Sequence, residues 1–200
     1  VDGPWKLRKE CAEALVALCD AARAEGHELY LKSAYRSYYK QAVMYENRVK
    51  KYGYDDGWVT KPGASDHQTG LGCDVVPRNW TDRGMNEDMA KEPEIQWMAE
   101  NCARFGFILR YQEGWEDVTG YKAEEWHFRY VGVELAMEMK DTDVYGVDNL
   151  EDVLRILSGE EPCEDLHIRN RKDVGTASSE EDRKADIMDF SEIIGQEGAK

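Results

Sequence analysis

The sequence lacks the features that would place the protein in a membrane. No apolar run among its 200 residues approaches the roughly 18 that a membrane-spanning helix needs, and no charged-then-apolar signal segment opens the chain. The chain begins at Val1 and not at methionine. We therefore expect contact with a membrane only through an N-terminal export segment or anchor that is missing from this chain.

Basic residues and paired cysteines are also scarce. The chain has 26 Lys and Arg against 41 Asp and Glu, a formal charge of −15 that repels phosphate backbones and excludes nucleic acid as an expected partner. The five cysteines form no CxxC pair, so no disulfide scaffold is indicated. Cys11 and Cys19 lie on one predicted helix, too far apart for a disulfide, and we interpret these two as small buried apolar residues.

The order of apolar periods and turn residues predicts an α+β fold, a single domain with a small antiparallel sheet flanked by helices. Helical spacing alternates irregularly with short β-branched and aromatic runs, without the regular strand-helix-strand repeat of a parallel sheet. Gly26, Gly53 and Gly106 mark predicted helix ends, and Ser37 is a predicted helix cap. The predicted helices are 6–25, 38–51, 93–105, 133–140 and 149–157, and the predicted strands are 28–35, 73–76, 107–111 and 125–131.

The composition changes near residue 158. Residues 1–158 carry all the patterned segments, whereas residues 159–200 are acidic and nearly free of aromatic side chains. The sequence therefore predicts one domain over 1–158 and a flexible acidic tail over 159–200. Within the tail, the stretch "IMDFSEII" (187–194) is a candidate short docking helix.

Three residues form a candidate metal site. Only four histidines are present, and His67 and His127 lie with Asp74 in structured segments bounded by glycines. Two imidazoles and one carboxylate suit a zinc ion with one position left open for water. The chain has no HExxH motif, so this site would not be built on one helix.

A zinc ion that activates water also needs a general base. Glu124, three residues before His127, is placed to supply it. Because residues three apart face opposite sides of a regular strand, we expect Glu124 to lie in the turn that leads into the strand.

Three ordered motifs carry a family resemblance. The segment "SDHQTGLGCD" (65–74) resembles the SxHxxGxAxD motif of VanY-type D-alanyl-D-alanine carboxypeptidases, "EEWH" (124–127) resembles their ExWH motif, and "SAYRSYYKQ" (33–41) resembles SxYRSxxxQ. These enzymes share a zinc fold with the VanX dipeptidases and the hedgehog signalling domain. The resemblance covers roughly residues 6–157.

The resemblance implies roles for individual residues. His67, Asp74 and His127 would bind one zinc ion per chain, and Glu124 would be the base. Arg36 would stabilise the oxyanion, while Ser65 and Gln41 correspond to substrate-binding positions. Glu125 stands where relatives often have proline and is not expected to be the base.

Cys73 and three tryptophans raise further questions about the site. Cys73 stands where the family has alanine. Because successive strand side chains alternate, we expect Cys73 to point away from the metal. Trp80, Trp115 and Trp126 are interpreted either as walls of the cleft or as core residues, and the sequence leaves both readings open.

The resemblance implies a zinc-dependent D,D-carboxypeptidase that removes the terminal D-alanine from peptidoglycan stem peptides, outside the cytoplasm in the cell envelope. Two alternatives stay open. One is an L,D-peptidase or D-Ala-D-Ala dipeptidase of the same fold, because motifs fix metal chemistry better than substrate choice. The other is a non-catalytic, zinc-stabilised binding module.

Overall fold

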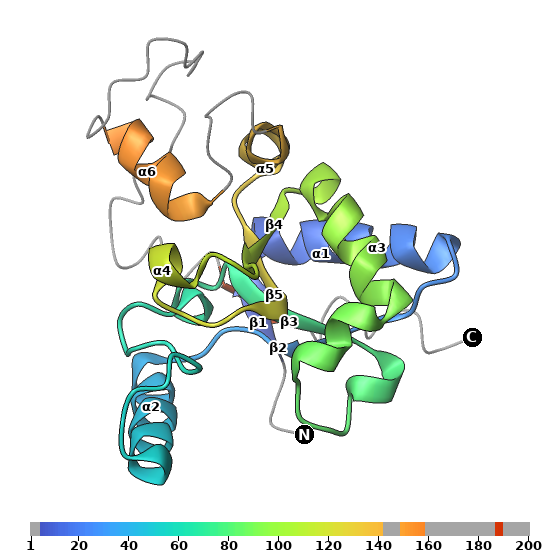
Figure 1. Cartoon of the computed structure of the whole chain (residues 1–200). Helices are drawn as coiled ribbons and strands as arrows, with labels where there is room; N and C mark the ends of the chain where they lie inside the picture. Colours follow the sequence, from blue (N-terminus) through green and yellow to red (C-terminus); the bar gives the residue numbers. More distant parts are fainter. Residues whose placement is uncertain (1–4, 142–148, 159–186, 190–200) are drawn as a thin grey trace.

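The computed structural model describes residues 5–141, 149–158 and 187–189, and its centre is a four-stranded antiparallel sheet (Figure 1). The strands are arranged in the order β2-β3-β5-β4. Their bounds are β2 Leu29–Ser33, β3 Gly72–Pro77, β4 Phe107–Tyr111 and β5 Glu124–Tyr130. The two central strands, β3 and β5, are therefore separated by about fifty residues of sequence but are direct neighbours.

Helices α1 (Lys9–Ala24) and α3 (Pro93–Asn101) lie together on one side of the sheet, whereas α2 (Tyr38–Tyr52) lies on the other side (Figure 1). The main core is formed between the sheet, α1 and α3, where Leu15, Met98 and Phe107 are almost inaccessible to solvent. Burial of this apolar surface is the main stabilising contribution to the fold.

Two short helices form a second, smaller core. Helix α5 (Val133–Lys140) and helix α6 (Leu150–Ser158) bury Ala136 and Val153 against Ile108 of β4. The remaining short elements of the described residues are η1 Asp66–Thr69, η2 Arg78–Trp80, η3 Glu87–Lys91, η4 Cys102–Phe105 and α4 Glu116–Thr119. None of the helices in the described residues is long and apolar enough to cross a membrane.

The predicted α+β class, with a small antiparallel sheet flanked by helices, is confirmed. The local signals that predicted helix ends act as expected. Ser37 caps α2 by accepting a hydrogen bond from the backbone N–H of Lys40, and Gly53 ends that helix in the left-handed conformation at φ 81°.

Two predictions about the chain termini are wrong. The first helix was predicted to begin at Lys6, but Lys6–Arg8 is strand β1 and α1 begins at Lys9. The docking helix predicted over 187–194 is also incorrect where the structure describes it, because Ile187–Asp189 is strand β6 and pairs antiparallel with β1. In both cases backbone pairing between distant segments decides the conformation, and three-residue strands have no detectable periodicity. The rest of the predicted tail lies outside the described residues.

The extended segment at Lys6–Arg8 also fixes two loops of the molecule. The backbone N–H of Arg8 donates to the carbonyl of Gly70, and the N–H of Tyr35 donates to the carbonyl of Lys6, at 2.9 and 2.8 Å. A helix beginning at Lys6 would point these groups along its own axis. The strand conformation therefore holds the turn after η1 and the loop after β2 in place.

Gly72 allows the two halves of the "SDHQTGLGCD" segment to touch. A Cβ atom at Gly72 would lie 2.7 Å from the Cβ of Asp66 and 2.9 Å from its carbonyl carbon, closer than non-bonded carbons approach. Gly70 has a different role, because its φ of 73° is the left-handed turn that ends η1. The chain thus folds back so that η1 packs directly on the start of β3.

Gly72→Ala is expected to destabilise the protein by about 1–3 kcal/mol, because the added methyl group overpacks against backbone atoms that cannot move aside freely. Gly84→Ala is the matched control, since a Cβ there meets nothing within 4 Å and the backbone is not left-handed. Urea denaturation of both variants checks this. Equal midpoints for Gly72→Ala and the wild type would contradict the close contact.

Candidate metal centre

The pairing of β3 with β5 brings two predicted ligands together. Asp74 is the direct antiparallel partner of His127, and the neighbouring pair is Cys73 with Phe128. Because side chains alternate across a sheet, these two pairs face opposite sides. Cys73 and Phe128 are fully buried in the main core, so the expectation that Cys73 points away from the metal site is confirmed.

His67 reaches the same place from η1, which immediately precedes β3. Its Nδ1 lies 2.7 Å from the carbonyl oxygen of Ala34, in the loop after β2, and its Nε2 lies 3.3 Å from Oδ2 of Asp74. The imidazole therefore uses Nδ1–H to bond the backbone and turns Nε2 towards the carboxylate. Its ring is 4.8 Å from that of His127, at an interplanar angle of 68°.

The three predicted ligands converge as the sequence indicated. One ligand atom from each of His67, Asp74 and His127 lies within 4.8 Å of the others, and all three side chains are buried. For His127 the atom that faces Asp74 is Nδ1, at 2.9 Å from Oδ1. Two imidazole nitrogens and a carboxylate oxygen are a donor set that suits a divalent transition metal, so the residues fit the ion that the sequence predicted.

The pKa values of the clustered side chains are shifted because carboxylates and imidazoles lie close together in a buried place. Burial raises the pKa of Asp74, but the charge of His67 and the hydrogen bond to His127 outweigh it and hold this pKa well below its usual range. Burial lowers the pKa of His127, but the nearby carboxylates of Asp66 and Asp74 prevail and raise it to about 9. A metal ion must therefore displace a proton from His127, which makes binding dependent on pH.

Glu124 lies in β5 itself, and the expectation that it belongs to the preceding turn is wrong. It pairs with Tyr111 of β4, while Phe128 of β5 pairs with Leu109. Between these two pairs β5 therefore contains two more residues than β4 does. This irregularity interrupts the alternation of the strand. The sequence argument assumed that a residue three positions from His127 could reach the same side only from outside a strand.

The surroundings of Glu124 and Glu125 differ sharply. Burial raises the pKa of Glu124 to about 8, and the charges that act on it include those of His127, Asp74 and Arg36. Burial also raises the pKa of Glu125, but the charges that act on it are those of Glu113 and Glu87, neither of which belongs to the ligand cluster. Of these two glutamates, only Glu124 is placed to exchange protons at the candidate centre.

Arg36 is fixed beside the cluster by two side chains. Its Nη1 donates to Oε1 of Gln41 at 2.7 Å, and its Nη2 donates to Oγ of Ser33 at 3.2 Å. Ser33 of β2 is the cross-strand partner of Asp74 of β3. The guanidinium of Arg36 is therefore hydrogen-bonded to a residue next to a candidate ligand. Burial lowers the pKa of Arg36, with the charges of Asp74 and Glu124 opposing it.

The two predicted substrate-binding residues are both buried. Gln41 is 1% exposed, and both ends of its amide are hydrogen-bonded, because Nε2 donates to the carbonyl of Thr60 at 2.6 Å while Oε1 accepts from Arg36. Ser65 is 4% exposed and directly precedes η1. The structure shows Gln41 as a support for Arg36, and contact of either residue with a substrate stays a prediction.

Two of the three tryptophans belong to a third buried cluster, separate from the two cores described above. Trp80 and Trp126 are nearly inaccessible and pack together with Val76 and Met89. The indole of Trp126 stacks on that of Trp58, and the Trp80 indole N–H donates to Oε1 of Glu92. Trp115 is half-buried next to α4.

Sequence reasoning missed Asp66, whose carboxylate lies behind His127. Its Oδ2 is 3.5 Å from Nε2 of His127 and 3.1 Å from Nε of Arg110, and its Oδ1 accepts from Arg129. Burial raises the pKa of Asp66, yet His127 and the two arginines together hold it below its usual range. In the sequence, Asp66 is recognisable only as an acidic residue directly before His67. Its arginine partners lie more than forty residues further along the chain.

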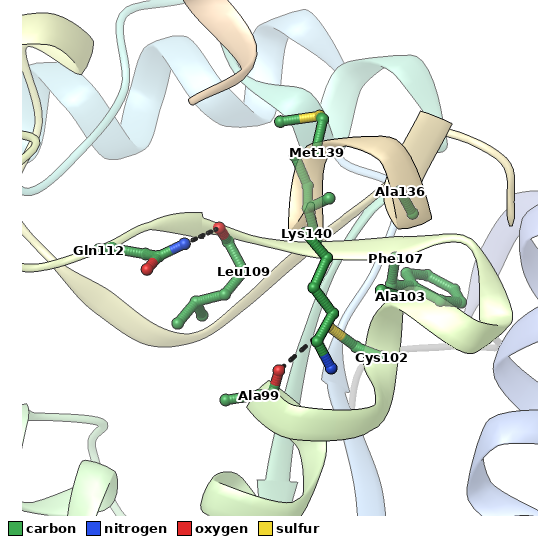
Figure 2. A pocket seen from close by; sticks show the side chains of 10 residues that line it. Ala99, Cys102, Ala103, Phe107, Leu109, Gln112, Ala136, Met139 and Lys140 are labelled. Atoms are coloured by element: carbon green, nitrogen blue, oxygen red, sulfur yellow. Dashed lines mark hydrogen bonds between the residues drawn. The ribbon is translucent and has the colours of Figure 1, made fainter. Parts of the chain in front are cut away.

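The cavity that Figure 2 shows does not overlap this cluster. It has a volume of about 250 Å³ between η4, β4 and α5, and it is lined mainly by apolar side chains such as Cys102, Phe107 and Ala136 (Figure 2). Lys140 at its edge donates to the carbonyl of Glu100. None of the predicted site residues lines this cavity.

Metal-free protein is expected to lose stability as pH rises. His127 keeps its proton in the folded state to about pH 9, whereas an unfolded imidazole releases it near 6.5, so its contribution is complete below 6.5 and lost as pH approaches 9. Glu124 also contributes stability that is lost as pH rises from 4.5 to about 8, because its pKa is raised in the folded state. Thermal unfolding in chelator at about pH 6 and about pH 9 measures this. A higher unfolding temperature at the alkaline pH would contradict it.

Comparison with known proteins identifies relatives for most of the described chain. A family model described as VanY, D-alanyl-D-alanine carboxypeptidase, matches residues 4–133. The D-alanyl-D-alanine carboxypeptidase of Enterococcus faecalis is 38% identical over 133 residues, which are 61% of this chain and 47% of the relative. The chain spans about half the length of three curated relatives that it matches.

Solved structures share the same fold. The LdcB LD-carboxypeptidase superposes with a TM-score of 0.67 at 39% identity, over 74% of this chain and 68% of that one. A VanY D,D-pentapeptidase variant from a VanB-type vancomycin resistance cassette, solved in complex with Zn(II), gives 0.64 at 32% identity, over 77% and 86%. Because the family match extends over more than half of the sequence and includes all three candidate ligands, this chain belongs to the VanY family of D-alanyl-D-alanine carboxypeptidases.

Proposed function

We propose that the protein is a zinc-dependent D,D-carboxypeptidase that removes the terminal D-alanine from peptidoglycan stem peptides. The observation that carries the proposal is the convergence of His67, Asp74 and His127 with Glu124 and Arg36 at one place. Membership of the VanY family supports the reaction, and the solved VanY relative in complex with Zn(II) supports the metal.

His67, through Nε2, and His127, through Nδ1, would hold the zinc ion together with Asp74. When bound, the ion supplies Lewis-acid chemistry, which polarises a carbonyl and acidifies water. Glu124 takes a proton from the attacking water, whose oxygen forms a bond to the scissile carbonyl carbon. When the C–N bond breaks, Glu124 returns the proton to the leaving amine.

Arg36 would stabilise the negative charge that develops on the carbonyl oxygen. A guanidinium suits this role because it remains charged and donates from a rigid fork. The hydrogen bonds from Arg36 to Gln41 and Ser33 restrict its position before substrate arrives, which reduces the reorganisation required in the transition state.

A second candidate is L,D-carboxypeptidase activity. The observation that favours it is the likeness to LdcB, at 39% identity over 74% of this chain. Both reactions require the same metal, base and arginine, so they differ only in which stem peptide and which bond the cleft accepts. A non-catalytic binding module is less well supported, because it would require neither Glu124 nor Arg36 beside the ligands.

The proposed substrate also indicates where in the cell the protein acts. Stem peptides lie in the cell envelope, so we propose that the chain acts outside the cytoplasm. We further propose that residues 1–158 carry the whole catalytic unit, since every candidate site residue and all three buried clusters of the described residues precede residue 159. Strand β6 pairs with β1 but contributes no candidate site residue.

Glu124→Gln is expected to lower kcat by about 10²–10⁴-fold and to leave zinc content unchanged, because the amide keeps the size of the side chain but cannot accept the proton. Glu125→Gln is the matched control on the same strand and should retain activity. Steady-state kinetics combined with metal analysis checks both variants. Reversed effects would show that the proton passes through Glu125.

Mass spectrometry of peptide products tests the substrate proposal. A stem pentapeptide ending in D-Ala-D-Ala is expected to lose one D-alanine, and the same peptide ending in D-Ala-L-Ala is expected to react about 10²-fold more slowly, because inversion displaces the terminal carboxylate. A tetrapeptide ending in an L-residue followed by D-Ala is the third substrate. Preference for it would establish the L,D reaction, and zinc-loaded protein that cleaves none of the three would overturn the proposal.

A further inference from the structure

Asp66 connects the candidate metal centre to two arginines. Its side chain is 10% exposed and lies between Nε2 of His127, at 3.5 Å, and the guanidinium of Arg110, at 3.1 Å. Arg129 donates to its other oxygen. A single carboxylate thus contacts the back of a candidate ligand and two positive charges in a nearly dry environment.

The two ring nitrogens of His127 face different carboxylates. Nδ1 lies 2.9 Å from Oδ1 of Asp74, which belongs to the ligand cluster. Nε2 is buried and forms no hydrogen bond among the described residues, and Oδ2 of Asp66 lies 3.5 Å from it. A metal-bound imidazole usually donates its second N–H to a carboxylate, carbonyl or water, and that bond fixes both the tautomer and the orientation of the ring. Asp66 occupies the position of this second partner for His127.

Arg110 extends the contact to α6. Its Nη1 and Nη2 form a fork on the carboxylate of Glu151, at 2.9 and 2.5 Å, while its Nε donates to Asp66. The side chain of Arg110 is 12% exposed and that of Glu151 is 28% exposed, so water screens this pair only partly. Glu151 lies beyond residues 4–133, the part of the chain that the family model matches.

We propose that Asp66, Arg110 and Glu151 form a positioning chain that orients His127 and makes α6 part of the metal centre. The inference rests on the proposed function, because it presumes that His127 binds zinc. The balance of charges explains why the positioning chain requires Glu151. Asp66 and Glu151 balance Arg110 and Arg129, so removal of Glu151 would leave one unbalanced positive charge near a site for a divalent cation.

The experiment measures zinc affinity in the full chain by competition with a chromophoric chelator. Asp66→Asn is expected to weaken zinc binding by about 10–100-fold, the usual effect of removing an outer partner of a ligand. Glu151→Gln is expected to weaken it by about 2–30-fold, because it acts through Arg110. Glu151→Asp keeps the charge and should restore part of the loss.

Glu13→Gln is the matched control. It makes the same change on α1, where Glu13 is 59% exposed and forms only a long ion pair with Lys9 at 3.9 Å. We expect its zinc affinity to equal that of the wild type. Thermal unfolding of each metal-free variant separates loss of fold from loss of positioning, since a positioning residue changes zinc affinity even where the metal-free unfolding temperature is unchanged.

The outcomes separate this inference from the proposed function. If the wild type binds no zinc, the proposed function itself is wrong. If the wild type binds zinc and Glu151→Gln binds it equally well, α6 is not coupled to the centre and the positioning chain is refuted. The double variant Asp66→Asn with Glu151→Gln should be no weaker than Asp66→Asn alone, because both changes interrupt one chain, and fully additive losses would also refute it.

Discussion

The cross-strand pair of Asp74 and His127 is the constraint on which the rest of the site depends. It exists because β3 and β5 are antiparallel neighbours in one register, and a slip of either strand by one residue would turn that strand's member of the pair into the core. The buried pair Cys73 and Phe128 holds that register, since slippage of either strand would take its member of this pair out of the core. Packing on one face of the sheet therefore fixes the chemistry on the other.

Around this pair, each functional group is fixed by a different part of the fold. The loop after β2 bonds His67 through the carbonyl of Ala34, and α2 supplies Gln41 to hold Arg36. The irregularity of β5 sets the position of Glu124, and burial raises the pKa of its carboxyl group. Such arrangements of buried charge are costly unless the groups compensate one another, which explains why nearly every charged side chain here has a partner of opposite sign.

The sequence predicted which residues form the candidate ligand cluster, the four strands of the central sheet and most of the helices. These features depend on local signals, namely spaced motifs, apolar periods, Ser37 as a cap and glycines at turns. It failed where distant segments meet. Strands β1 and β6 form by pairing across most of the chain, and the contacts of Asp66 with Arg110 and of Arg110 with Glu151 span more than forty residues each. The position of Glu124 depends on a register shift against β4, which no pattern within β5 reveals.

Metal stoichiometry tests the central claim most directly, namely that these residues form one zinc site. After equilibrium dialysis against zinc, elemental analysis of the wild-type protein should give one zinc ion per chain. His127→Ala should lose most of this zinc while remaining folded, because two ligands hold the ion far less tightly than three. Full zinc occupancy in His127→Ala, or no bound zinc in the wild type, would contradict the account.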